Sequence, residues 1–174
     1  MTDAGNAVDD SPDEVHHVVA LLRERLYGAI SCLATLAILA RYSDEDTSAW
    51  ARILDIAVAT GGLWAASLLS HWVAHLAVFG KAPQRREAVR IVQTSGQIVA
   101  AAVPPLIVLV VAVFGILDTD TAMWIAIWTL IGELGLIAVL AVRKTRLPWW
   151  QRVLAVAGLV GVGLIVVVIK MIAH

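Results

Sequence analysis

Hydrophobic residues in this chain come in long blocks separated by short polar connections, rather than alternating with polar residues. Several blocks are about 20 residues long. As an α-helix rising about 1.5 Å per residue, such a block is long enough to cross the ~30 Å hydrocarbon core of a bilayer. The pattern predicts five membrane-spanning helices, at about residues 18–41, 51–79, 91–117, 121–142 and 149–172. We therefore expect an all-α integral membrane protein with five transmembrane helices.

The start of the chain has a different character. Its first residues, MTDAGNAVDDSPDE, are acidic and hydrophilic, and they contain too few apolar side chains to build a core. The sequence therefore predicts a disordered acidic tail over residues 1–17, followed by a five-helix transmembrane domain over residues 18–174.

Basic residues concentrate in alternate connections. Arg23 and Arg25 precede the first predicted span, and the loops KAPQRREAVR and VRKTRLPWWQR carry eight further lysines and arginines. The intervening connections contain the acidic stretches SDEDTS and LDTDT. Because cytoplasmic loops carry an excess of Lys and Arg, we expect the N-terminus in the cytoplasm and the C-terminus outside, in the cell's inner (plasma) membrane.

Composition supports a membrane location and excludes some chemistry. The 174 residues are 60% hydrophobic and 16% charged, against about 25% charged in a typical soluble domain. The single cysteine, Cys32, excludes an internal disulfide and a cysteine-based metal cluster within one chain. No nucleophile stands at a plausible spacing from a base, and there is no Gly-rich phosphate loop, so we expect no enzyme. We also expect no permanently bound cofactor and no nucleic-acid partner.

Three ionisable residues fall well inside predicted spans. His71 and His75 lie one turn apart on one face of the second span, and Glu133 lies in the fourth. His71 and Glu133 are each nine or ten residues from the cytoplasmic end of their span, which places both roughly 13–15 Å deep. Ionisable groups inside a bilayer are costly and mark function by default, so these three predict a polar pathway. Imidazole and carboxylate together suit divalent first-row metals, and histidine also titrates near neutral pH.

Weaker polar features accompany these residues. Ser67 continues the face of His71 by one turn, and Gln97 lies near the cytoplasmic end of the third span. Pro104 and Pro105, near the middle of that span, are expected to bend or unwind it and to free carbonyl oxygens that can bind a cation. A structural interpretation stays open for all these residues. Under it the histidines are neutral and hydrogen-bonded, and the glutamate is protonated or paired.

Four stretches resemble the vacuolar iron transporter-like family, which exports ferrous iron and manganese from the cytosol in exchange for protons. LYGAISCLATLAIL is similar to that family's Y-G-x-x-D-G pattern, and GLWAASLLSHWVAH is similar to its Gly-Leu start followed by S-M-x-x-G-E. AAVPPLIVLV is similar to its A-x-x-P segment, and RKTRLPWWQRVLAVAGLVGVGLIVVVIK to its basic loop and Gly-rich last helix. The resemblance implies a homodimer of five-helix subunits with a metal path between them.

This chain departs from the family at the positions that the resemblance implies for metal ligands. Ser31 stands where the family's first-span aspartate would fall, and His71 and His75 stand where its second-span methionine and glutamate would fall. A short basic loop replaces the family's long metal-binding insert after the second span. A shift from carboxylate and thioether to imidazole would favour different ions, zinc among them, or would accompany a loss of transport.

The leading hypothesis is a small homodimeric transporter or channel for a divalent metal cation (iron, manganese or zinc), with or without proton coupling. The metal would be a substrate rather than a cofactor. The residues that would line the path are His71, His75, Glu133 and Ser31, supported by Ser67, Pro104, Pro105 and Gln97. The alternative is a non-transporting membrane scaffold or regulatory subunit whose intramembrane polar residues are structural.

Overall fold

The computed structural model describes residues 12–42, 48–143 and 148–172, which form five α-helices and, within these ranges, no strand. The helices are α1 (Pro12–Tyr42), α2 (Ala49–Phe79), α3 (Arg85–Val113), α4 (Thr119–Arg143) and α5 (Trp149–Ile172). The all-α class and the number of helices predicted from the sequence are confirmed.

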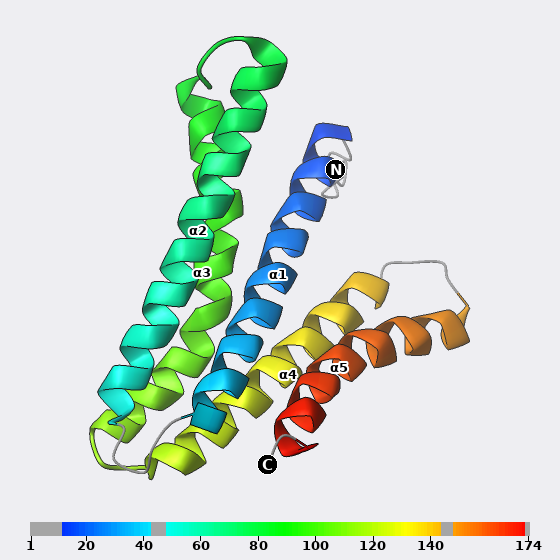
Figure 1. The fold of residues 1–174 in the computed structure, drawn as a ribbon. Coiled ribbons are helices and arrows are strands. Elements are labelled where there is room, and N and C mark those ends of the chain that lie inside the picture. The colour runs from blue at the N-terminus through cyan, green and yellow to red at the C-terminus, as the bar shows by residue number, and fades with distance from the viewer. Residues whose placement is uncertain (1–11, 43–47, 144–147, 173–174) are drawn as a thin grey trace, which may run out of the picture.

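Successive helices run in opposite directions, so the start of α1 and the end of α5 lie at opposite ends of the bundle (Figure 1). α2 and α3 form a long hairpin beside α1, while α4 and α5 lie at an angle to it (Figure 1). α1 contacts each of the other four helices. It is therefore the element that can connect polar groups on α2 with polar groups on α4.

Local sequence sets the ends of α2 and α3. Ser48 caps the start of α2, its hydroxyl accepting a hydrogen bond from the backbone N–H of Ala51 at 3.3 Å. Gly80 ends α2 with φ 63°, in the left-handed region where a residue without Cβ is favoured. A capping box then begins α3, in which the backbone N–H of Gln84 donates to Glu87 Oε2 at 2.8 Å.

A glycine and an aspartate set the turn between α3 and α4. Gly115 has φ 72°, which again suits a residue without a side chain. The Asp118 carboxylate accepts hydrogen bonds from the backbone N–H and the hydroxyl of Thr121, at 3.1 and 3.3 Å. The backbone hydrogen bond from Thr121 is the main cause that lowers the pKa of Asp118 below its ordinary value, because it stabilises the ionised form.

The bounds of two helices, α1 and α3, correct the prediction. α1 begins at Pro12, so residues 12–17 are helical rather than part of a disordered tail, and residues 1–11 of that tail lie outside the described residues. Proline is well tolerated at the first helical position, and the acidic residues just after it interact favourably with the helix dipole. α3 begins at Arg85 and ends at Val113, short of the predicted Leu117, because the chain turns at Gly115.

Pro104 and Pro105 lie inside α3 without unwinding it, so of the two expected outcomes, a bend or an unwound segment, the structure excludes the unwound segment. The helix is continuous from Arg85 to Val113. Proline removes a hydrogen-bond donor, but its fixed φ of about −65° is itself helical. Pro105 is buried, and α1, α2 and α4 all pack against α3. Packing against these neighbours therefore keeps the segment helical in spite of the missing donors.

Three of the helices, α2, α3 and α4, are long and apolar enough to cross a membrane. The first half of α1 contains charged residues, and α5 includes a shorter apolar stretch, Trp149–Ile165. These lengths and compositions are those of a membrane protein.

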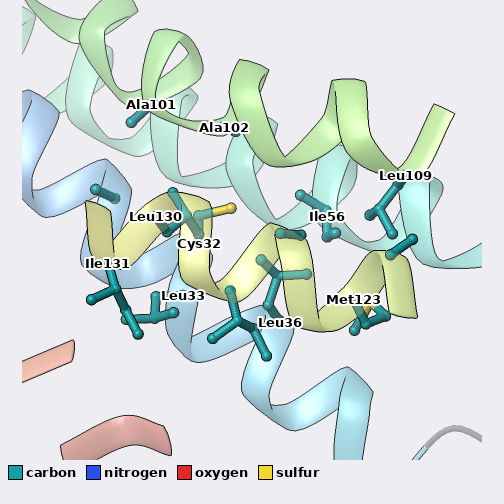
Figure 2. Close-up of a cluster of buried hydrophobic side chains, with 14 of the residues drawn as sticks. Cys32, Leu33, Leu36, Ile56, Ala101, Ala102, Leu109, Met123, Leu130 and Ile131 are labelled. Atoms are coloured by element: carbon teal, nitrogen blue, oxygen red, sulfur yellow. The ribbon is translucent and has the colours of Figure 1, made fainter. Parts of the chain in front are cut away.

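The buried core lies where α1, α3 and α4 meet (Figure 2). Leu33 and Leu36 of α1, Leu109 of α3 and Leu130 of α4 are fully buried there. In a membrane protein such side chains stabilise helix contacts through close van der Waals packing, because lipid tails are as apolar as leucine. This core holds α1 between the α2–α3 hairpin and α4.

Gly28 marks a close approach of α1 to α3. A Cβ atom at this position would lie 2.7 Å from the Ile98 Cα and 2.9 Å from its carbonyl oxygen. Only glycine therefore fits between the two backbones at this point. Glu24 lies one turn before Gly28, and Ser95 lies just under one turn before Ile98, so this contact also positions polar side chains against each other.

Candidate functional site

Polar side chains of α1 and α2 line a cavity of about 440 Å³ between these two helices. Glu24 comes from α1, and Ser67, Ser70 and His71 come from α2. Carboxylate, hydroxyl and imidazole groups therefore meet in one cavity between α1 and α2. We take this cavity as the candidate functional site.

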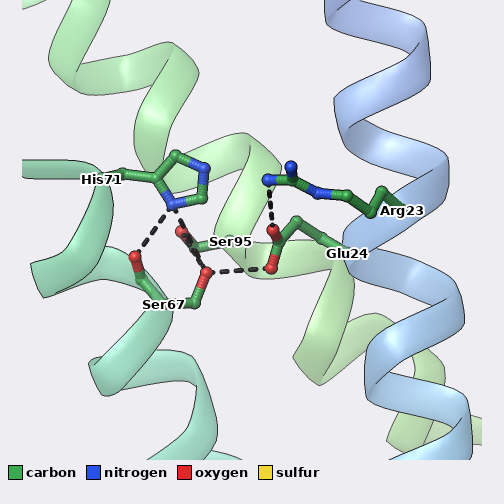
Figure 3. A network of polar contacts seen from close by, with 5 residues as sticks. All are labelled: Arg23, Glu24, Ser67, His71 and Ser95. Atoms are coloured by element: carbon green, nitrogen blue, oxygen red, sulfur yellow. Dashed lines mark hydrogen bonds and ion pairs between the residues drawn. The ribbon is translucent and has the colours of Figure 1, made fainter. Parts of the chain in front are cut away.

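Glu24 is nearly buried, with 7% of its surface exposed. Its Oε2 accepts a hydrogen bond from the Ser67 hydroxyl at 2.9 Å, and its Oε1 accepts one from Arg23 at 3.1 Å (Figure 3). The Ser67 oxygen also lies 3.3 Å from the Ser95 hydroxyl of α3. The carboxylate is thus tied to α2 directly and to α3 through Ser67, while its cationic partner Arg23 is exposed.

His71 lies one turn after Ser67 and lines the same cavity (Figure 3). Its Nδ1 is 2.8 Å from the backbone carbonyl oxygen of Ser67. A carbonyl oxygen can only accept a hydrogen bond, so Nδ1 carries the hydrogen and the lone pair of the neutral ring is on Nε2. Nε2 makes no hydrogen bond with another described residue. The ring can therefore bind a proton or a metal ion at Nε2 without breaking an existing hydrogen bond.

The register of the α1–α2 hairpin brings Glu24 and Ser67 together. Glu24 precedes Tyr42, the last residue of α1, by 18 positions, and Ser67 follows Ala49, the first residue of α2, by 18 positions. Residues equally far from the turn between two antiparallel helices lie at the same level, since both helices rise about 1.5 Å per residue. The pairing therefore follows from where α1 ends and where Ser48 caps the start of α2.

A second polar contact lies one residue further along α1. Arg25 Nε donates to Glu133 Oε1 of α4 at 2.8 Å. The Glu133 side chain is 9% exposed and the Arg25 side chain 37%. Glu133 Oε2 is buried and has no hydrogen-bond partner among the described residues. Glu133 and Ser67 thus contact neighbouring residues of α1, yet Glu133 pairs with an arginine and not with His71.

Removing one member of this ion pair is expected to destabilise the protein by about 1–3 kcal/mol, below the full cost of breaking a buried pair because Arg25 reaches solvent. Arg25→Gln should cost more than Glu133→Gln, because it leaves the less exposed charge alone. The double substitution should cost less than the sum of the two single ones. Thermal unfolding in detergent measures the stability of each variant. Asp55→Asn, an exposed position of α2, is the control, and additive single effects would contradict the pairing.

The structure separates the two histidines. His75 Nε2 lies 3.6 Å from Glu87 Oε2 of α3, and its ring lies 4.6 Å from that of Phe79. His75 does not line the cavity. Although the histidines share one face of α2, His71 bonds back to its own helix, whereas His75 reaches across to α3.

The other predicted site residues also lie outside the cavity lining. Ser31 is half-buried in α1, and its carbonyl oxygen accepts a hydrogen bond from the Thr35 hydroxyl at 3.0 Å. Gln97 is half-buried in α3, and Pro104 and Pro105 lie further along the same helix. Of the residues predicted from the sequence, the structure brings Ser67 and His71 together in this site.

Within the part of the chain that the structure describes, no group of three or more His, Cys, Asp and Glu side chains could hold a metal ion. The cavity offers one carboxylate and one imidazole, with hydroxyls beside them, and the guanidinium of Arg23 also lines it. A structural metal usually takes four protein ligands. Two donors instead suit a proton, or a cation that binds transiently and keeps some of its water.

Hydropathy alone does not identify Glu24 as a site residue, because the run Arg23–Glu24–Arg25 resembles the charged end of a short first span. Two sequence signals can reveal it. No glycine interrupts the chain between Pro12 and Gly28, which favours one continuous helix. The equal spacing of Glu24 and Ser67 from the α1–α2 turn then places the carboxylate beside the face that carries His71.

Comparison with known proteins gives no relative: no family model, curated protein or solved structure matches this chain. The relationship to the vacuolar iron transporter-like family stays a prediction from sequence motifs. The functional inference below is built on the cavity and its side chains.

Proposed function

We propose that this protein is a multi-pass membrane transporter or channel that moves protons, a divalent metal cation or both, with Glu24, Ser67 and His71 as its cation-binding site. The observation that carries the proposal is the free Nε2 of His71 beside a nearly buried carboxylate in one cavity. Ionisable groups at such positions are costly, and they are retained where ions or protons pass.

Proton coupling follows from the chemistry of the same two side chains. Imidazole titrates near neutral pH, and a proton and a metal ion compete for the same lone pair. The Glu24 carboxylate of the same cavity, which is paired with the exposed Arg23, would offset the charge of the bound cation once that cation replaces Arg23 as its partner. When Nε2 of His71 carries a proton, a metal ion that binds there would displace that proton to the solvent, and protonation of Nε2 would in turn release the metal. One cavity can in this way exchange the two.

The membrane arrangement belongs to the same proposal. We infer that α1 and α5 cross the bilayer together with α2, α3 and α4. Five spans place the two termini on opposite sides, in line with the opposite ends of the bundle at which α1 begins and α5 ends (Figure 1). The basic connections then put the N-terminus in the cytoplasm. Homodimer formation remains part of the proposal, although one protomer supplies the whole cavity.

A second candidate, a membrane scaffold or regulatory subunit, is favoured by one observation. Glu133 and His75 face charged partners within the chain, Arg25 and Glu87. Internal partners of this kind are what structural polar residues inside a membrane require. This candidate gives no role to the free ring nitrogen of His71.

Flux into proteoliposomes distinguishes the two candidates. The purified protein would be reconstituted with a pH-sensitive dye and a metal-sensitive dye inside, and Mn²⁺, Fe²⁺, Zn²⁺ or a proton gradient would be applied. We expect saturable, protein-dependent uptake of at least one ion, with proton movement in the opposite direction when the ion is a metal. Metal uptake should fall at acidic pH, because protonated imidazole cannot bind a metal. Flux no greater than in protein-free liposomes for all four would reject transport and favour the scaffold.

A further inference from the structure

Four basic residues gather at the end of the α2–α3 hairpin. Lys81 lies in the turn, and Arg85, Arg86 and Arg90 lie on the first two turns of α3. All four are exposed, and none makes an ion pair with another residue that the structure describes. They therefore form a concentrated, uncompensated positive surface.

Three of these residues form a hollow. Arg85, Arg86 and Arg90, together with Val89, line a cavity of about 590 Å³. Arg86 and Arg90 are one helical turn apart, and Arg85 and Val89 are one turn apart beside them. Each guanidinium presents a planar fork of N–H donors that fits the oxygens of a phosphate group.

The nearest acidic residue does not neutralise this hollow. Glu87 lies on the same turns of α3, but its Oε2 accepts the backbone N–H of Gln84 at 2.8 Å and lies 3.6 Å from His75. Its carboxylate is therefore used in capping α3 and in the contact with α2. The one negative charge of Glu87, whose side chain is 50% exposed, therefore offsets only part of the four positive charges of Lys81, Arg85, Arg86 and Arg90.

Exposed apolar side chains lie at the same end of the α2–α3 hairpin as the basic hollow, and one of them, Val89, lines it. Val78 and Phe79 at the end of α2 are 74% and 60% exposed, and Val89 and Val92 of α3 are about half exposed. α2 and α3 are two of the three helices long and apolar enough to cross a membrane. If both cross it, their connecting turn emerges at a membrane surface, with arginines next to side chains that face acyl chains.

We propose that Arg85, Arg86 and Arg90 bind the phosphate-bearing headgroup of an anionic phospholipid at this membrane surface. Charge complementarity selects an anionic headgroup over a zwitterionic one, and the adjoining valines and Phe79 select a lipid over a free anion. The site is distinct from the cavity between α1 and α2, and it requires that the hairpin spans the bilayer. It does not require that the protein transports an ion.

Native mass spectrometry of the detergent-solubilised full chain tests the proposal. Phosphatidylglycerol and phosphatidylcholine would be added in turn, and the lipid retained on the protein would be counted at each concentration. We expect preferential binding of phosphatidylglycerol. Its apparent affinity should fall about fivefold for Arg86→Gln or Arg90→Gln alone, and about 100-fold for the triple Gln variant, since each basic residue near an anionic surface contributes comparably. The single variants keep the test usable if the triple variant does not insert.

The matched control replaces all three arginines with lysine, which keeps the charge and should retain most of the preference. Unchanged phosphatidylglycerol binding in the triple Gln variant would overturn the proposal. Competition by millimolar inorganic phosphate as effective as that by the lipid would also overturn it, because the site would then take a free anion. A lipid preference without ion flux in proteoliposomes would uphold this site and reject the transport function. Ion flux without a lipid preference would uphold the transport function and reject this lipid site.

Discussion

Adding a single methyl group at Gly28 is expected to destabilise the protein by about 1–3 kcal/mol, the usual cost of overpacking a tight contact. The added Cβ would lie 2.7 Å from the Cα of Ile98, which is backbone and cannot turn aside. α1 and α3 would have to separate, although alanine is the better helix former by about 1 kcal/mol. Gly28→Ala should therefore unfold at a lower temperature in detergent, and Gly28→Leu at a still lower one.

Gly132→Ala is the matched control, because a Cβ there meets nothing within 4 Å. This variant should be as stable as the parent protein or slightly more stable, through its higher helix propensity. Equal stabilities of Gly28→Ala and Gly132→Ala would contradict the close approach of α1 to α3. Because Glu24 lies one turn from Gly28, separation of the two helices should also weaken cation binding at the candidate site.

Replacing Glu24 with glutamine is expected to lower cation flux about 10- to 100-fold. Interactions with a charged group contribute about 1.5–3 kcal/mol, and glutamine keeps the size of the side chain while removing its charge. The amide oxygen can still accept the hydrogen bond from Ser67, which is 2.9 Å from the carboxylate in the parent protein. Thermal stability should therefore change little, which separates a functional role from a structural one. The measurement is initial flux in proteoliposomes, with thermal unfolding alongside.

Glu14→Gln is the control for this substitution, since Glu14 is an exposed residue near the start of α1 and lies outside the cavity lining. It should leave flux and stability unchanged. His71→Gln should reduce flux as Glu24→Gln does, and it should also remove the loss of metal uptake at acidic pH. Full flux in both Glu24→Gln and His71→Gln would contradict the assignment of the cation site to this cavity.

Two residues of the candidate site could be predicted from the sequence. His71 and Ser67 are visible as polar residues one turn apart in an apolar helix, and the structure places both on one cavity. Their partner Glu24 is hidden by its two arginine neighbours. The matching of His71 with Glu133 by depth predicts only their level along the helices, and depth says nothing about the direction in which a side chain points. The sequence suggested a histidine as the partner of Glu133, but in the structure Arg25 of α1 forms the ion pair with it.

The sequence by itself determined the five helices and most of their ends. Long apolar blocks, the caps at Ser48 and Gln84, and the turn glycines Gly80 and Gly115 are local signals, because a helix satisfies its hydrogen bonds within its own segment. Tertiary structure alone decided which polar side chains meet. That outcome depends on the rotation of each helix about its axis and on α1 lying between α2 and α4. Contacts between distant segments fix both, among them the close approach of Gly28 to Ile98, and no local pattern encodes them.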